Sequence, residues 1–188
     1  MGMPETTGRW TREMVLALPD DGKRYELFDG ELLVTPAPSW LHQRLVMAFY
    51  DRLKPYALAH GLGEVLLSPA DVPLDGEQVA QPDLFVIPPP AVRPPASWTE
   101  LPNPILVLEV LSPSTAHNDK VIKRRSFQRN RIPEYWIADP DARAVDRWRP
   151  ADSRPEILDE GLAWQPSPDH PPLELDLPTL FREAWGES

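Results

Sequence analysis

Residues 104–123 carry the clearest pattern of hydrophobic and polar positions in the chain. Within them, residues 105–111 form a continuous aliphatic run of strand length, which is typical of a central β-strand buried on both faces. Glu109 is the one charged residue in this run, and it shares a strand face with the other odd-numbered positions. A buried carboxylate is destabilising unless a cation, a metal ion or hydrogen-bond donors compensate it, so Glu109 is the leading functional candidate.

The N-terminal third predicts a hairpin followed by a long helix. Two short strand-like runs occupy residues 24–35 around Asp29 and Gly30, a dipeptide that favours a tight hairpin turn because glycine tolerates positive φ. Residues 39–59 then show apolar positions at helical spacing, and Ser39 stands where the N-cap belongs. We therefore expect an N-terminal β-hairpin and an amphipathic helix with one buried stripe.

The remaining elements predict an α/β domain with a mixed central sheet flanked by helices. A basic helix is expected to begin at Asn118 or Asp119, with Asp119, Lys123 and Phe127 on one face. We expect one domain over residues 1–188, with a core over about 39–150. A C-terminal segment over about 151–188 should dock on this core, and only its apolar residues 173–181 are expected to make the contact. Further strands are expected at residues 64–68, 79–87, 134–138 and 145–149.

Composition narrows the class of protein. The 188 residues include no cysteine, which excludes disulfides and thiolate metal sites, and no apolar run approaches the ~20 residues of a membrane span. We expect a soluble, cytoplasmic protein. Its net charge of −10 argues against broad adhesion to nucleic acid. A local basic surface is still present, because residues 120–131 contain six Lys or Arg residues and no acidic residue.

Two carboxylates stand at related positions in neighbouring predicted strands. Asp83 precedes the apolar run of residues 84–87, and Glu109 interrupts the next strand. Both can therefore lie at one end of the same sheet, where paired acidic oxygens suit Mg²⁺ or Mn²⁺. The backbone carbonyl of Val110 is a candidate third ligand. Lys123 is the candidate catalytic lysine, because its helix leaves the end of the Glu109 strand.

Two motifs carry a resemblance to a known family. EVLSPST at residues 109–115 and PEYWIADP at residues 133–140 resemble the Uma-type family, a large and mostly uncharacterised bacterial family of restriction endonucleases within the PD-(D/E)XK superfamily. The resemblance also covers YELFDGEL from Tyr25, residues 40–43 and the Pro82–Asp83 pair. It implies a restriction-endonuclease-like core and metal-dependent hydrolysis of DNA. Asp83 and Glu109 are implied as metal ligands and Lys123 as the catalytic lysine.

The chain departs from the superfamily pattern at one important position. The superfamily places its lysine two residues after the glutamate, and here that position is Leu111. The lysine must therefore come from the helix, at Lys123. Each candidate also has a structural alternative: Glu109 as an ion-pair partner of Lys123, Asp83 as a turn cap, and Lys123 as a solvated helix lysine.

Several residues are secondary candidates. Glu31 follows the hairpin turn and His42 opens the first long helix, and either can reach a site at the sheet edge. Asp119 lies one helical turn from Lys123. The basic helix supplies three candidate nucleic-acid contacts, Lys120, Arg124 and Arg125.

These observations favour a Mg²⁺-dependent endonuclease acting on DNA. A competing hypothesis is a catalytically inactive protein that keeps the nuclease fold as a nucleic-acid-binding or interaction module. Leu111 at the expected lysine position and the acidic net charge motivate that alternative. Exposed tryptophans and the open edges of a small sheet also favour a homodimer.

Overall fold

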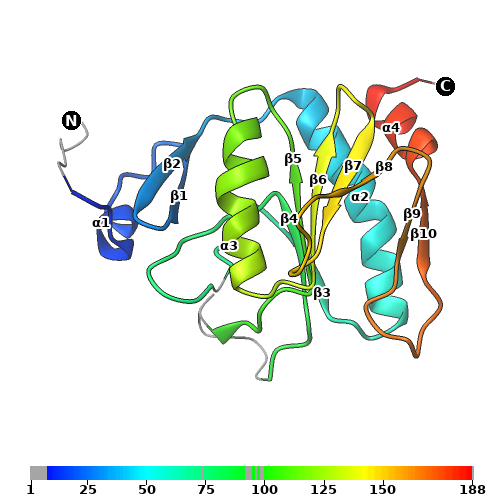
Figure 1. Cartoon of the computed structure of the whole chain (residues 1–188), viewed down its shortest axis with the longest axis horizontal. Helices are drawn as coiled ribbons and strands as arrows, with labels where there is room; N and C mark the ends of the chain where they lie inside the picture. The colour runs from blue at the N-terminus through cyan, green and yellow to red at the C-terminus, as the bar shows by residue number, and fades with distance from the viewer. Residues whose placement is uncertain (1–7, 73, 92–94, 96, 98–99, 188) are drawn as a thin grey trace.

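A six-stranded mixed sheet forms the centre of the fold (Figure 1). The structure is a computed structural model, and it describes residues 8–72, 74–91, 95, 97 and 100–187. Strands β5 and β6 run parallel, and every other neighbouring pair in this sheet is antiparallel. The strands lie side by side in the order β3 (Glu64–Leu67), β4 (Leu84–Ile87), β5 (Leu106–Val110), β6 (Glu134–Asp139), β7 (Ala144–Trp148) and β8 (Glu156–Leu158).

Strand β5 is buried on both faces, as its sequence predicts. Leu106, Leu108 and Val110 pack into the hydrophobic cluster on one face of the sheet. Val107 and Leu111 pack into the cluster on the other face, so the odd-numbered positions share a side. The alternation does not extend to residue 105, which packs with the first cluster because it lies just before the regular strand.

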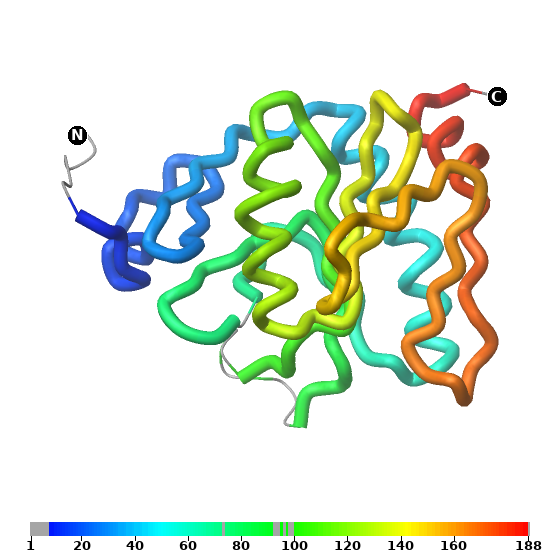
Figure 2. Tube along the Cα trace, in the orientation of Figure 1, coloured from blue at the N-terminus to red at the C-terminus, as the bar shows by residue number. Residues whose placement is uncertain are grey.

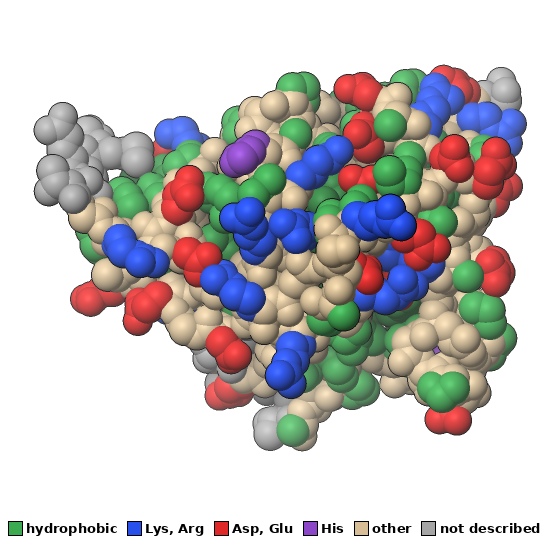
Figure 3. Space-filling model, viewed as in Figure 1, with side chains coloured by type: hydrophobic (Ala, Val, Ile, Leu, Met, Phe, Trp, Pro, Cys, Tyr) green, Lys and Arg blue, Asp and Glu red, His purple; other side chains and the backbone are tan. Residues whose placement is uncertain are grey.

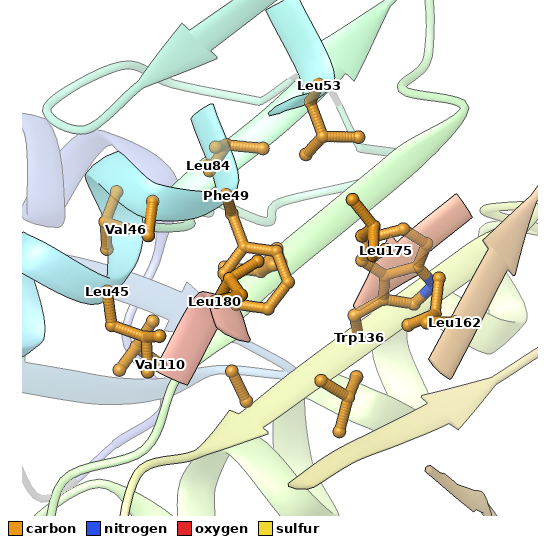
Figure 4. Packing of buried hydrophobic residues seen from close by; sticks show 14 of the residues in the cluster. Leu45, Val46, Phe49, Leu53, Leu84, Val110, Trp136, Leu162, Leu175 and Leu180 are labelled. Carbon is orange, nitrogen blue, oxygen red and sulfur yellow. The ribbon is translucent and has the colours of Figure 1, made fainter. Parts of the chain in front are cut away.

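Helices α2 (Trp40–Ala59) and α4 (Leu177–Trp185) cover the first face, together with a hairpin of β9 (Gly161–Trp164) and β10 (Leu173–Asp176) (Figure 1). Figure 4 shows side chains of all four elements meeting those of the central sheet, and Trp136 of β6 lies among them. The docked segment is therefore larger than residues 173–181. Helix α4 begins at an Asp176 N-cap and ends at a left-handed Gly186 with φ 73°.

The second face is covered by one continuous helical segment and by the N-terminal hairpin (Figure 2). The segment comprises the π-helix η2 (Asn118–Lys123) and α3 (Arg124–Arg129). The expected hairpin is present as β1 (Arg24–Phe28) and β2 (Glu31–Thr35), with α1 (Arg12–Leu16) packed beside it. Its turn has φ 54° at Asp29 and 83° at Gly30, as a tight hairpin requires.

The strand expected over residues 79–87 is shorter than predicted. Only β4 is regular, whereas Val79 and Ala80 form isolated bridges to Leu27 and Val72. Pro82 lies between the two parts and has no backbone N–H to donate to a strand ladder. Among the described residues, none of the helices combines the length and the apolar character that a membrane span needs.

Candidate active site

A cavity of about 760 Å³ opens at the end of the sheet where β4 begins and β5 ends. Its wall combines the start of β1, the first turn of α2 and the loops around residues 112–116 and 139–141. Its charged and titratable lining residues include Lys23, Arg24, His42, Asp83, Glu109, Asp119 and Lys120. These seven side chains come from five separate parts of the chain and meet in one cavity.

The antiparallel pairing of β4 with β5 brings Asp83 beside Glu109. Leu84 pairs with Leu108, so the next residues outward, Asp83 and Glu109, meet at the end of the ladder. The backbone N–H of Asp83 donates to Glu109 Oε2 at 3.3 Å, and the N–H of Val110 donates to Asp83 Oδ2 at 2.8 Å. The two side chains predicted as metal ligands are thus adjacent, and they are only 4% and 1% exposed.

Asp83 is surrounded by donors, and we call Asp83, Arg24 and His42 the Asp83 cluster. Arg24 Nη1 lies 2.6 Å from Oδ1, and His42 Nε2 lies 3.0 Å from Oδ2. Burial alone would raise the pKa of Asp83, but the hydrogen bond with His42 and the charge of Arg24 outweigh burial and lower that pKa well below its usual value. Asp83 is therefore held as an anion.

Glu109 belongs to a second group, the Lys123 cluster, which consists of Lys123, Glu26, Glu109 and Asp119. Lys123 Nζ lies 2.8 Å from Glu26 Oε2, 2.9 Å from Glu109 Oε1 and 3.2 Å from Asp119 Oδ1. Burial would lower the pKa of Lys123, but these three carboxylates outweigh it and raise that pKa well above its usual value. The ammonium group is the shared counter-ion of three carboxylates.

In this cluster, the pKa values of Glu109 and Asp119 are shifted in the opposite direction from that of Asp83. Burial raises the pKa of Glu109 well above its usual value, and Asp83, Asp119 and Glu26 raise it further against the opposing effect of Lys123. Burial likewise raises the pKa of Asp119. Two neighbouring carboxyl groups, Asp83 and Glu109, are thus driven toward different protonation states.

The π-helix η2 sets the position of Lys123. Such helices occur mostly as single turns inside α-helices, and they are frequent at functional sites. Here Asp119 and Lys123 are four residues apart and pair across one turn, while both side chains point into the protein. Tyr135 of β6 donates its hydroxyl to the Asp119 carbonyl at 3.1 Å, which fixes the start of this turn to the sheet.

The donor chemistry of the site fits a hard divalent cation. Within the described part of the chain, four buried acidic side chains (Glu26, Asp83, Glu109 and Asp119) lie close to two permanently charged cations, Arg24 and Lys123, so acidic groups outnumber the cations. Glu26 Oε2 and Asp119 Oδ1 pair with Lys123 by charge but have no aligned hydrogen-bond donor within the described part of the chain. In that same part, no group of three or more His, Asp or Glu side chains forms a metal cage. Mg²⁺ does not need three such side chains, because it commonly binds one or two protein carboxylates and keeps water molecules as its other ligands.

The structure differs from the sequence-based interpretation at the hairpin. Glu31 is exposed and lines a separate shallow hollow beside Arg9 and Gly30, so it does not reach the main cavity. Glu26 and Arg24, from the preceding strand, reach the site instead. Strand alternation was the available signal for them, because both residues share the face of β1 that carries the buried Phe28.

The other predicted residues fall into two groups. His42, Asp119 and Val110 line the cavity with Asp83 and Glu109. Lys123 is only 1% exposed and is not a cavity-lining residue, so it contacts the site from behind Glu109. Leu111 also lines the cavity, and it packs into the second hydrophobic cluster.

The predicted basic surface lies over η2 and α3. Figure 3 shows Lys and Arg side chains gathered on the face of the molecule that these helices form, with acidic side chains among them. Lys120 lies at the cavity, 3.7 and 3.6 Å from Asp139 and Asp146, and Arg124 stacks on Trp148. Arg125 is exposed, and no ion pair involves it in the described residues.

Comparisons with known proteins agree with this architecture. The sequence model of the Uma2 family, described as "Putative restriction endonuclease", matches residues 12–178. A crystal structure described as that of a "putative nuclease" from Anabaena variabilis ATCC 29413 is similar with a TM-score of 0.71 and 22% identity, covering 93% of this chain and 98% of that chain. It confirms the predicted fold. No curated protein matches this chain.

Proposed function

Because this chain belongs to the Uma2 family, we propose that it is an endonuclease that hydrolyses DNA phosphodiester bonds with the help of Mg²⁺ or Mn²⁺. Family membership supports a nuclease function in general. The observation that carries the finer proposal is the pair of adjacent carboxyl groups, Asp83 and Glu109, in a cavity where buried acidic side chains outnumber the permanently charged cations that pair with them. Such a pair is an appropriate ligand set for a hard divalent cation.

In this proposal the residues have distinct roles. Asp83 and Glu109 hold the ion, and the backbone carbonyl of Val110 is the third protein ligand. A bound divalent ion polarises the phosphodiester and lowers the pKa of water. Lys123 neutralises Glu109 from the interior and stabilises the charge that develops at the site. Lys120 at the cavity, with Arg124 and Arg125 beyond it, contacts the substrate backbone.

The experiment combines calorimetric titration of Mn²⁺ with a plasmid-nicking assay on four proteins: wild type, Asp83→Ala, Glu109→Ala and Glu134→Gln. We expect both site variants to lose metal binding and metal-dependent nicking while remaining folded by circular dichroism. Glu134→Gln is the matched control, because Glu134 is a half-buried carboxylate on the adjacent strand β6 but does not line the cavity. Nicking that survives in either site variant would refute the assignment.

A second candidate function is a nucleic-acid-binding or interaction module without catalysis. It is favoured by the burial of Lys123 behind Glu109 and by the placement of Leu111 where the superfamily lysine is expected. In that case wild type binds DNA in a salt-sensitive manner and does not nick it with any divalent ion.

The homodimer remains a prediction. Trp40 and Leu58 on α2 are 67% and 77% exposed, and an apolar interface would cover such side chains. Sedimentation of the wild type at several concentrations tests it.

A further inference from the structure

Arg24 forms an ion pair with Asp83, the carboxylate that the proposed metal site needs as a ligand. Its Nη1 donates to Asp83 Oδ1 at 2.6 Å, while the other oxygen of Asp83 accepts from the Val110 N–H and lies 3.0 Å from His42 Nε2. Both oxygens of Asp83 are therefore engaged by donors of the protein. A divalent ion that binds Oδ1 must displace the guanidinium, because two cations cannot share that oxygen at bonding distance without strong repulsion.

The remaining contacts of Arg24 are weak. Nη1 is also 3.4 Å from Ser68 Oγ, and Nε is 3.9 Å from Glu26 Oε2. Nε has no hydrogen-bond partner among the described residues although it is buried. A guanidinium carries five N–H donors in a planar fork, and here only Nη1 makes hydrogen bonds within that part of the chain. The contact with Asp83 is therefore the one short hydrogen bond of this side chain in the described structure, and the nearby carboxyl groups of Glu109 and Glu26 also attract its charge.

The position of Arg24 gives it an alternative partner. It is the first residue of β1, it lines the cavity beside Asp83, and its side chain is 16% exposed. Arginine keeps its charge at every accessible pH, and its fork matches the oxygens of a phosphate group. A phosphodiester in the cavity would supply the anion that Asp83 supplies when the cavity is free of substrate.

We propose that Arg24 is a latch that competes with the metal ion for Asp83 and is released when it pairs with a phosphate oxygen of the substrate. This inference rests on the proposed nuclease function, and it adds that binding of the metal ion and binding of nucleic acid are coupled through Arg24. Arg24 opposes metal binding in the free protein, and nucleic acid removes that opposition. By thermodynamic reciprocity, the metal ion then strengthens binding of nucleic acid by the same factor.

The test measures binding rather than cleavage. Mn²⁺ is titrated calorimetrically into wild type, Arg24→Met and Lys23→Met, each with and without a short DNA oligonucleotide whose 3′-bridging oxygens are replaced by methylene groups. These linkages keep both non-bridging phosphate oxygens, but their P–C bonds cannot be hydrolysed. Lys23→Met is the matched control, because Lys23 lines the same cavity and carries the same charge but pairs with Asp21 at 2.7 Å instead of Asp83. Circular dichroism verifies that each variant is folded.

We expect Arg24→Met to bind Mn²⁺ in the absence of DNA about tenfold more tightly than wild type, within the usual range for coupling between sites. The oligonucleotide should tighten Mn²⁺ binding to wild type and to Lys23→Met, but not to Arg24→Met. If Arg24→Met binds Mn²⁺ as tightly as wild type or more weakly, the proposal that Arg24 competes with the metal ion is wrong, and Arg24 only positions Asp83. Absence of Mn²⁺ binding by every protein would instead refute the proposed function.

Discussion

The Asp83 cluster and the Lys123 cluster both combine buried carboxyl groups with basic side chains, yet the pKa of Asp83 is lowered and that of Glu109 is raised. Asp83 lies at the cavity and accepts from a backbone N–H, an arginine and a histidine, so its pKa is lowered. Burial raises the pKa of Glu109, which is in direct contact with Asp83, because the single lysine that Glu109 shares with two other carboxylates does not outweigh burial. The number of donors per carboxylate, rather than burial, separates the two.

This difference has a functional meaning. Pairs of titratable groups whose pKa values are driven apart by their surroundings commonly mark the acid and base assignments of an active site. Under the proposed function, Asp83 is the ligand that is already anionic before a cation binds, whereas Glu109 would lose its proton more readily once a cation is present.

The largest effect is expected from removing the shared cation of the Lys123 cluster. Lys123→Met should lower the free energy of unfolding by about 3–5 kcal/mol, because three buried carboxylates lose their common counter-ion. Urea denaturation measures this loss. Lys120→Met serves as control and should stay within about 0.5 kcal/mol of wild type, since Lys120 is exposed and its partners are at 3.6 and 3.7 Å.

A double variant separates charge from packing. If charge causes the loss, Lys123→Met combined with Glu109→Gln should be more stable than Lys123→Met alone, because one of the uncompensated carboxylates is then neutral. No recovery in the double variant would mean that the lysine stem, rather than its ammonium group, stabilises this region.

A smaller effect should appear in the pH dependence of stability. The pKa of Glu109 in the folded protein lies above its ordinary value of 4.5, so the folded state binds this proton more tightly than the unfolded chain does. The resulting stabilisation is complete below pH 4.5 and is lost as pH rises through the folded pKa. It changes by about 1.4 kcal/mol for each pH unit in that window.

Comparing wild type with Glu109→Gln isolates this contribution, because Asp83 and Asp119 are present in both proteins. Urea denaturation across pH 5, 7 and 9 should show the stability of wild type falling relative to Glu109→Gln. A difference that does not change with pH would mean that Glu109 is ionised throughout, and that Lys123 compensates it fully.

The sequence predicted the parts of the site that depend on local pattern. The aliphatic run around Glu109 predicted a strand buried on both faces, and the helical spacing of Asp119 and Lys123 predicted that they share a face. The motifs pointed to the family that the comparisons confirm. Each of these inferences needs only the period of a strand or helix, or a contiguous motif.

The contribution of the hairpin could not be predicted in the same way. Its existence followed from Asp29 and Gly30, but its placement depends on long-range contacts such as the bridge between Leu27 and Val79. Without that placement, Glu31 was the candidate selected from the hairpin, and Glu26 was not considered. The same applies to Arg24, because nothing near it in the sequence indicates that its guanidinium meets Asp83, 59 positions away.

The smallest predicted effect concerns the exposed surface of α3, which carries one arginine with an ion-pair partner and one without such a partner in the described residues. Arg125 and Arg129 are both exposed on α3, but Arg129 pairs with Asp29 at 2.6 Å whereas no ion pair in the described residues involves Arg125. If α3 contacts phosphates, Arg125→Gln should reduce the slope of log affinity against log salt concentration by about 0.9, the value for one lost contact on duplex DNA.

Arg129→Gln is the matched control for this measurement. It removes the same charge from the same helix, but the existing pair with Asp29 means that fewer counter-ions are released when DNA approaches, so the slope should change less. Fluorescence anisotropy with a labelled duplex in Ca²⁺ provides both slopes. Equal slopes for Arg125→Gln and wild type would place the phosphate backbone away from α3, and the contact would then be sought at Lys120 on the cavity rim.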